Sequence, residues 1–169
     1  MNRKGFTVIE LLVVIVILGI VMALVINFGS SILGNAKKDL YVQDAREYIK
    51  AARIELIKHS NRYPIDDHNT TTTYYIHINN IPMEAESGSP WGDWVEAYVV
   101  VAVDSEMNYI YGWTSKDVAG YTVETVREDK LSRKDIIYTD PESGLSFPAF
   151  EGRNNKIIII GADGTVSEV

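Results

Sequence analysis

A run of 26 residues without a charged side chain, residues 11–36, limits what this chain can fold into more than any other feature. As a helix the run is about 39 Å long at 1.5 Å per residue, and the hydrocarbon core of a bilayer is about 30 Å thick. From residue 6 to residue 28, 17 side chains are Leu, Ile, Val or Phe. Their transfer favours membrane insertion by up to about 5–10 kcal/mol. The sequence therefore predicts a membrane-spanning helix.

The charges that flank this run indicate its orientation. Arg3 and Lys4 precede it, and the positive-inside rule keeps that end in the cytoplasm, although Lys37 and Lys38 follow the run and weaken the bias. The main alternative is a secretory signal peptide. Its apolar region has about 7–15 residues, with a small-residue cleavage site behind it. The run in this chain is longer, and it carries a carboxylate near its start.

That carboxylate belongs to Glu10. An ionisable side chain within a membrane segment is costly and usually has a partner. The plainer alternative is a hydrated carboxylate at the membrane surface. The residue alone does not separate these two interpretations.

The residues around Glu10 resemble a known signal. Residues 3–12, Arg-Lys-Gly-Phe-Thr-Val-Ile-Glu-Leu-Leu, are similar to the type III signal sequence of type IV prepilins and pseudopilins. The similarity extends over about the first 30 residues and includes Gly19, where the family commonly has glycine. In place of the proline that many members carry within the first helix, this chain has Asn27. Any softening of the helix is expected around residues 27–34, which are rich in glycine and serine.

The resemblance implies a maturation pathway. A membrane-embedded prepilin peptidase would remove the leader, residues 1–5, by cutting between Gly5 and Phe6, and the new amine of Phe6 would be N-methylated. Glu10 would then pair with the Phe6 amine of a neighbouring subunit during assembly. An unpaired charge in an apolar filament core is expensive, and a matched pair loses much of that penalty. The pair would therefore select the register of the subunits more than it would stabilise the filament.

The residues that follow predict an amphipathic helix. From residue 35 to residue 61, apolar side chains recur every three or four positions, and Pro64 bounds the segment. This helix can continue the membrane helix into one of about 55 residues. The apolar stripe predicts core packing rather than a cofactor site. It consists of Ala36, Leu40, Tyr41, Ala45, Tyr48, Ile49, Ala52 and Leu56.

The remainder of the chain predicts a β-sheet. After an irregular stretch over residues 63–93, strand patterns appear at residues 94–103, 109–114, 121–126, 156–160 and 166–169. Residues 74–78 predict a further short strand, and residues 136–138 either another strand or the end of a helix over 126–135. Residues 89–93, Ser-Pro-Trp-Gly-Asp, resemble the Pro-Trp-Gly turn before the sheet in many pseudopilins.

The predicted fold class is α+β, the pilin fold, with a long N-terminal helix packed on an antiparallel sheet. The expected parts are a leader at 1–5, a membrane-spanning half-helix at 6–34, an amphipathic half-helix at 35–62 and a head at 63–169. The last part is expected to pack on residues 35–62.

The rest of the composition contains no pattern typical of an enzyme. There is no cysteine, and the three histidines lie nine residues apart, which matches no metal-ligand spacing. Asp140, Glu142 and Asp163 could supply oxygen ligands to calcium, but no loop pattern of ligands is present and the sequence favours a solvated surface. Without the leader the chain has 14 basic and 23 acidic side chains, a net charge of −9, which does not favour nucleic acid. We therefore predict no enzyme activity, no metal and no cofactor.

The leading functional hypothesis is a structural subunit, a major or minor pilin of a type IV pilus. The alternative is a pseudopilin of a type II secretion or competence and DNA-uptake system, and a membrane-anchored enzyme or sensor domain is the third. Expected partners are other pilin subunits, the prepilin peptidase and N-methyltransferase, and the pilus assembly platform. The chain would lie in the cytoplasmic membrane before assembly and in a surface pilus (fimbrium) afterwards. Adhesion, twitching motility, DNA uptake and secretion remain open. The lack of cysteine departs from many Gram-negative pilins and is compatible with a Gram-positive origin.

Overall fold

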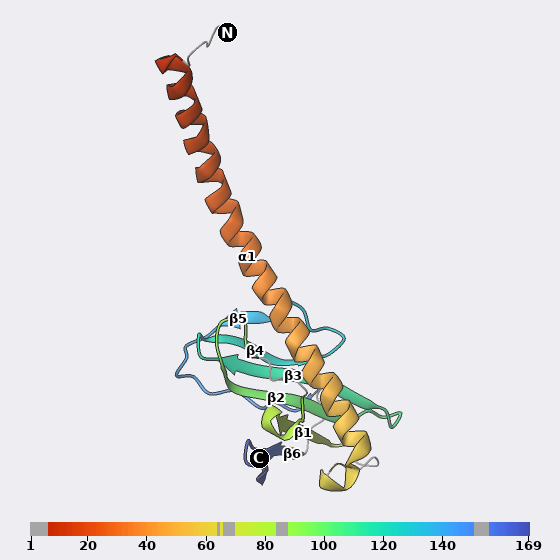
Figure 1. The fold of residues 1–169 in the computed structure, drawn as a ribbon. Helices are drawn as coiled ribbons and strands as arrows, with labels where there is room; N and C mark the ends of the chain where they lie inside the picture. Colours follow the sequence, from red (N-terminus) through yellow and green to blue (C-terminus); the bar gives the residue numbers. More distant parts are fainter. Residues whose placement is uncertain (1–6, 64, 66–69, 84–87, 151–155) are drawn as a thin grey trace. The chain divides into compact units, whose positions relative to one another are not determined.

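The structure is a computed structural model of the 169-residue chain. It describes residues 7–63, 65, 70–83, 88–150 and 156–169, apart from the side chain of Asn27. The described residues form one long helix, two short 3-10 helices and seven strands (Figure 1). They divide into two compact units, residues 1–36 and the head unit, residues 37–169. Each unit is described by itself below.

The helix α1 runs from Val8 to Lys58, so the prediction of a single long N-terminal helix is confirmed. Its backbone remains helical through residues 27–34, where a softening was expected. The helix ends three residues before the expected residue 61, because the chain tightens into the 3-10 helix η1, Ser60–Arg62. At this end the backbone N–H of His59 still donates to the carbonyl of Glu55 at 2.8 Å.

The remaining elements follow the sequence patterns closely. They are β1 (Thr72–His77), the 3-10 helix η2 (Ile78–Asn80), β2 (Trp94–Val103), β3 (Tyr109–Asp117), β4 (Tyr121–Arg127), β5 (Ile136–Tyr138), β6 (Lys156–Ile160) and β7 (Val166–Glu168). Of the two alternatives predicted for residues 136–138, a strand or the end of a helix, the structure shows the strand β5. No helix occupies residues 126–135, where β4 runs into turns instead.

The seven strands form one sheet in the order β5-β4-β3-β2-β1-β6-β7. Five of its six pairings are antiparallel, which agrees with the predicted α+β fold and is consistent with the pilin fold. The exception is the pair of β1 and β6, which is parallel, with Tyr74 opposite Ile158. The long connection between these strands permits this arrangement, since parallel neighbours cannot be joined by a tight turn.

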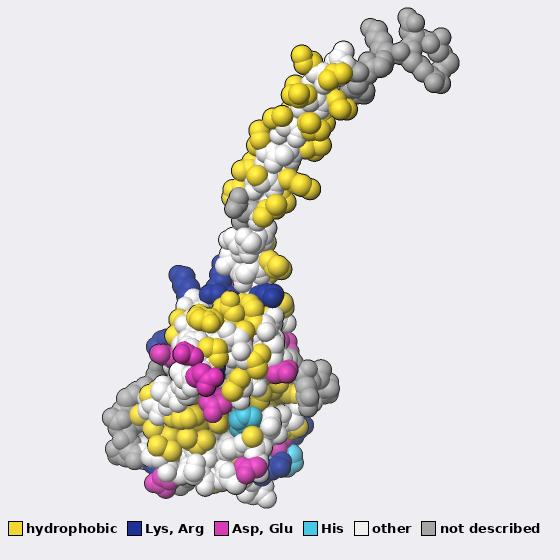
Figure 2. Space-filling model, turned by 90° about the vertical axis from the view of Figure 1, so that its left-hand side faces the viewer, with side chains coloured by type: hydrophobic (Ala, Val, Ile, Leu, Met, Phe, Trp, Pro, Cys, Tyr) yellow, Lys and Arg dark blue, Asp and Glu magenta, His cyan; other side chains and the backbone are white. Residues whose placement is uncertain are grey.

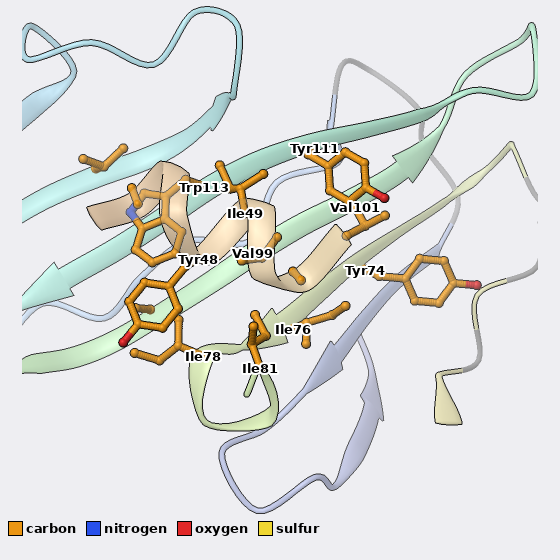
Figure 3. Close-up of a cluster of buried hydrophobic side chains, with 14 of the residues drawn as sticks. Tyr48, Ile49, Tyr74, Ile76, Ile78, Ile81, Val99, Val101, Tyr111 and Trp113 are labelled. Carbon is orange, nitrogen blue, oxygen red and sulfur yellow. The ribbon is translucent and has the colours of Figure 1, made fainter. Parts of the chain in front are cut away.

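One face of the sheet packs on the part of α1 that lies in the head unit. Tyr48 and Ile49 of α1 point at Val99, Val101 and Trp113 of the central strands (Figure 3). Most of the predicted stripe is buried there: Tyr41, Ala45, Tyr48, Ile49 and Ala52 are between 0% and 4% exposed.

Two members of the predicted stripe do not belong to this core. Leu40 is 52% exposed, and Ala36 is exposed as well. The spacing predicted both residues for the buried stripe, but the sheet does not cover their side chains. Glu55, a charged residue of the same helix, is buried. Its Oε2 lies 3.0 Å from Nδ1 of His59, and its Oε1 lies 3.4 Å from Nη1 of Arg62.

Aromatic rings fill the start of this core. Tyr41 lies 4.7 Å from Trp94 and 5.9 Å from Trp91, measured between ring centroids. Trp91 in turn stacks on Tyr121 at 4.0 Å. The Pro-Trp-Gly turn therefore contributes its tryptophan to the contact between α1 and the sheet.

The other face of the sheet is covered by the segment 140–150. Phe150 is buried there with Tyr75 and Tyr98, and Phe147 packs against them. The segment is held by polar contacts, because Lys116, only 2% exposed, donates from Nζ to the carbonyls of Asp140 and Ser143. A chain without cysteine thus fixes this segment by hydrogen bonds and aromatic packing.

Tyr75 makes the covering segment sensitive to alkaline pH. Its hydroxyl donates to the carbonyl of Pro148 at 2.6 Å, and burial raises the pKa of Tyr75 to about 12. A tyrosine in an unfolded chain has a pKa of about 10. Its contribution to stability is therefore complete below about pH 10 and is lost as the pH rises toward 12.

We expect the free energy of unfolding of the full chain in detergent to fall between about pH 10 and 12, and Tyr75→Phe to make this fall shallower. Urea unfolding followed by tryptophan fluorescence measures it, because all three tryptophans lie in the head unit. Tyr109→Phe is the matched control, since Tyr109 is exposed. An unchanged alkaline fall in Tyr75→Phe would show that this hydroxyl does not contribute.

Candidate assembly site

The first part of α1 exposes an extended, mainly apolar surface. Every described side chain from residue 8 to residue 33 is exposed, with Met22 at 70% and Phe28 at 67%. Figure 2 shows hydrophobic side chains along much of the visible face of this part of the helix. Soluble monomers rarely expose apolar patches larger than a few hundred Å². This surface therefore requires a cover, either lipid or the helices of other proteins.

Length and composition allow a membrane to be that cover. Among the described residues, α1 is the one helix that is long and apolar enough to cross a bilayer. A helix satisfies its own backbone hydrogen bonds, which any segment in hydrocarbon requires. Gly19, Gly29 and Gly34 have no atom within 4 Å of the position that a Cβ would take. These glycines therefore leave small gaps on the helix surface that nothing within the subunit fills.

Glu10 and Thr7 form a reciprocal cap at the start of α1. The backbone N–H and the hydroxyl of Thr7 both donate to Oε2 of Glu10, each at 2.8 Å. The backbone N–H of Glu10 donates back to the hydroxyl of Thr7 at 3.3 Å. This is the capping box, in which the residue before the helix and the third helical residue satisfy each other's free N–H groups. Within one subunit the carboxylate of Glu10 is thus held at the end of the helix.

The predicted cleavage and methylation residues, Gly5 and Phe6, lie outside the described residues. The roles predicted for Gly5, Phe6 and Glu10 stay predictions. Sequence reasoning also missed Thr7 as the partner of Glu10, although the Thr-x-x-Glu spacing carries that information.

The three acidic residues that could supply oxygens to calcium lie apart in the structure. Asp140 and Glu142 follow β5 at one edge of the sheet, whereas Asp163 lies in the turn between β6 and β7 at the other edge. Asp163 is engaged locally, since its Oδ1 accepts from the backbone N–H and the hydroxyl of Thr165 at 3.0 and 2.7 Å. Among the residues that the structure describes, no group of three His, Cys, Asp or Glu side chains is arranged to hold a metal ion.

The described histidines have local partners. His59 pairs with Glu55, and the ring of His77 lies edge-on to Tyr98 with centroids 5.0 Å apart. Burial lowers the pKa of His77, which keeps its ring neutral near pH 7. His68 lies outside the described residues.

The first part of α1 is long and apolar enough to cross a membrane, and the sheet packs on the second part of the same helix. Residues 1–26 match the protein-family model described as the prokaryotic N-terminal methylation motif. No curated protein and no solved structure matches the chain. This motif and this fold support a type IV pilin-like or pseudopilin protein. The motif indicates a structural pilin-type protein rather than an enzyme, processing by a prepilin peptidase, and membrane anchoring before assembly.

Proposed function

We propose that this chain is a structural subunit of a type IV pilus, a major or minor pilin that assembles through the first part of α1. One observation carries the proposal. The methylation motif at residues 1–26 coincides with the first part of α1, where every described side chain from residue 8 to residue 26 is exposed within the subunit. In the bilayer these side chains contact lipid, and in the filament they contact the same helix of other subunits.

Maturation in this proposal proceeds at the membrane. The peptidase cuts between Gly5 and Phe6, and its methyltransferase activity modifies the amine of Phe6. The amine is cationic at neutral pH, so it complements the carboxylate of Glu10 on a neighbouring subunit. Because a charge pair in an apolar environment is favourable only when matched, subunits in the wrong register are rejected. The assembly platform then draws the processed subunit from the membrane into the pilus.

Substitution of Gly5 tests the processing step. We expect Gly5→Val to remain as the full-length membrane-bound precursor, because a branched side chain replaces the glycine at the scissile bond. Mass spectrometry of the membrane fraction measures the N-terminus, which in the unmodified protein should be Phe6 carrying one additional methyl group.

The matched control for that experiment is Gly19→Ala. Gly19 lies in the same apolar helix, and a Cβ there meets nothing within 4 Å. This variant should therefore be cleaved and methylated normally. Cleavage of Gly5→Val at the normal rate would contradict the assigned site.

A pseudopilin is the second candidate, since the motif and the long helix are common to both classes. Immunogold labelling of cells with an antibody against the head unit distinguishes them. Label along whole filaments indicates a major pilin, and sparse or tip label indicates a minor pilin. A complete absence of labelled surface filaments from producing cells favours a pseudopilin of a secretion or DNA-uptake system. Adhesion and twitching motility are then tested in a deletion strain.

A further inference from the structure

One end of the head unit carries a positive surface. Residues 37–169 contain 14 basic and 22 acidic side chains, a net charge of −8. The segments 37–39 and 133–135 depart from this balance, with four basic and two acidic residues. Figure 2 shows dark blue side chains gathered where the head unit's part of α1 begins. The basic rim is the set Lys37, Lys38, Arg133 and Lys134.

Contacts bring the two segments of the basic rim together. Nζ of Lys38 donates to the carbonyl of Ile136 at 3.0 Å, which fixes α1 against β5. Nη1 of Arg133 lies 3.5 Å from Oδ2 of Asp39, and the two side chains are 52% and 63% exposed. An exposed pair at this distance is weak, so the guanidinium remains able to bind another anion. The Lys38 ammonium likewise keeps its charge, because a carbonyl does not neutralise it.

Aromatic residues adjoin the basic rim. Nζ of Lys37 lies 5.9 Å from the ring centroid of Trp91, which stacks on Tyr121. Tyr121 contacts Tyr138 edge-on at 5.9 Å, and Tyr138 is 68% exposed. Tyrosine and tryptophan are enriched beside Lys and Arg where proteins meet the surface of a bilayer.

We propose that the basic rim and Tyr138 bind the anionic phospholipid headgroups of the bilayer that α1 spans. The inference rests on the membrane anchoring within the proposed function. The uncharged residues 11–36 measure about 39 Å as a helix, and a bilayer with its headgroups is about 40–45 Å thick. Lys37 and Lys38 are the first cations after this run, so they reach the headgroup layer. The acidic remainder of the head unit is repelled by the same lipids, which turns the basic rim toward them.

This contact holds the head unit on the membrane before assembly. A second copy of the chain is the competing partner, because its acidic head also attracts a basic surface. The order of charges along the chain favours lipid, since Lys37 and Lys38 of the basic rim follow the membrane span directly. A single test separates the two partners.

The test uses the full chain in nanodiscs of pure phosphatidylcholine and in nanodiscs with about 30% phosphatidylglycerol. Because the chain has no cysteine, Ile137→Cys places one thiol beside the basic rim, at a position 41% exposed. We expect a neutral maleimide to react with this thiol at least about fivefold more slowly in the anionic nanodiscs. One Lys or Arg near an anionic surface favours binding by about 1 kcal/mol, which corresponds to a factor of about five in the binding constant. Ionic strength near 1 M should remove the protection by screening.

Two controls make the result specific. Ser105→Cys, in the turn between β2 and β3, lies one strand length from the basic rim and should react equally in both nanodiscs. Changing all four residues of the basic rim to Gln should abolish the protection of Ile137→Cys, with thermal melting showing that the head unit is still folded. The loss of protection at high ionic strength is measured in Ile137→Cys with the basic rim intact, so it tests the proposal even if the four substitutions unfold the head unit.

The outcomes are distinct. Equal rates at Ile137→Cys in both nanodiscs overturn the proposal, and so does protection that survives the four substitutions. If bilayer composition has no effect but the four substitutions abolish filaments, the basic rim is a subunit contact and the lipid proposal is wrong. Filaments are scored separately by electron microscopy. Failure of the pilus assignment, with lipid-dependent protection retained, leaves this proposal supported.

Discussion

Glu10→Ala is expected to abolish filaments while membrane insertion and leader cleavage continue. Removing the carboxylate takes away the partner of the Phe6 amine and leaves that amine unpaired in the filament core, which is strongly unfavourable. Insertion should not suffer, because an ionised side chain opposes it by up to about 2.5–3.5 kcal/mol at the centre of a membrane. Electron microscopy of sheared filaments and mass spectrometry of the membrane fraction measure the two effects separately.

Three comparisons isolate the charge of Glu10. Glu10→Gln keeps the size of the side chain and should fail as Ala does. Thr7→Ala removes the capping box and costs helix stability of about 0.5–2 kcal/mol, but it keeps the carboxylate and should assemble. Glu47→Ala removes an exposed carboxylate from the same helix and should assemble normally. Wild-type filament yield from Glu10→Ala would refute the charge-pair role.

Trp113→Ala is expected to destabilise the head unit by about 3–5 kcal/mol. Trp113 is 0% exposed, and its ring stacks on Tyr48 of α1 at 5.7 Å and meets Trp94 edge-on at 5.7 Å. Its Nε1 donates to Oγ of Ser115 at 2.5 Å. Truncation therefore removes the largest side chain between the helix and the sheet and leaves a buried hydroxyl short of one donor. Urea unfolding of the full chain in detergent, followed by circular dichroism, measures the loss.

The control for Trp113→Ala is Val95→Ala on β2. Val95 is 52% exposed, so its truncation should change the free energy of unfolding by no more than about 0.5 kcal/mol. Leader cleavage of Trp113→Ala should be unchanged, because the methylation motif ends at residue 26. A loss below about 1 kcal/mol would mean that the aromatic contact between helix and sheet contributes little.

Local periodicity predicted the elements of this fold but not all of their pairings. The stripe through Tyr41 and Ile49 predicted the buried face of α1, because side chains three and four residues apart share one face of a helix. Strand patterns do not specify neighbours, so the parallel pair of β1 and β6 was not foreseen. The same limit applies to Leu40, which the spacing assigned to the stripe but which is 52% exposed beside the fully buried Tyr41.

Sequence patterns did not predict which polar residues are buried. Lysine is almost never fully buried unless it is paired, so nothing in the sequence suggested that Lys116 would lie inside. Its burial depends on the carbonyls of Asp140 and Ser143, which the tertiary fold brings to it. Residue spacing was more informative at the N-terminus, where the order of Gly5, Phe6 and Glu10 predicted the motif that the family model matches.

Cysteine labelling of the first helix in surface filaments tests most directly the central claim that this chain assembles into a pilus through that helix. Single cysteines placed at positions from residue 8 to residue 33 are treated with a water-soluble maleimide in sheared, detergent-free filaments, with Ser105→Cys as the exposed reference. Our account predicts filaments that contain this chain, begin at Phe6, and protect the helix positions while the reference position reacts. Filaments without this chain, or helix positions that react as fast as Ser105→Cys, would contradict it.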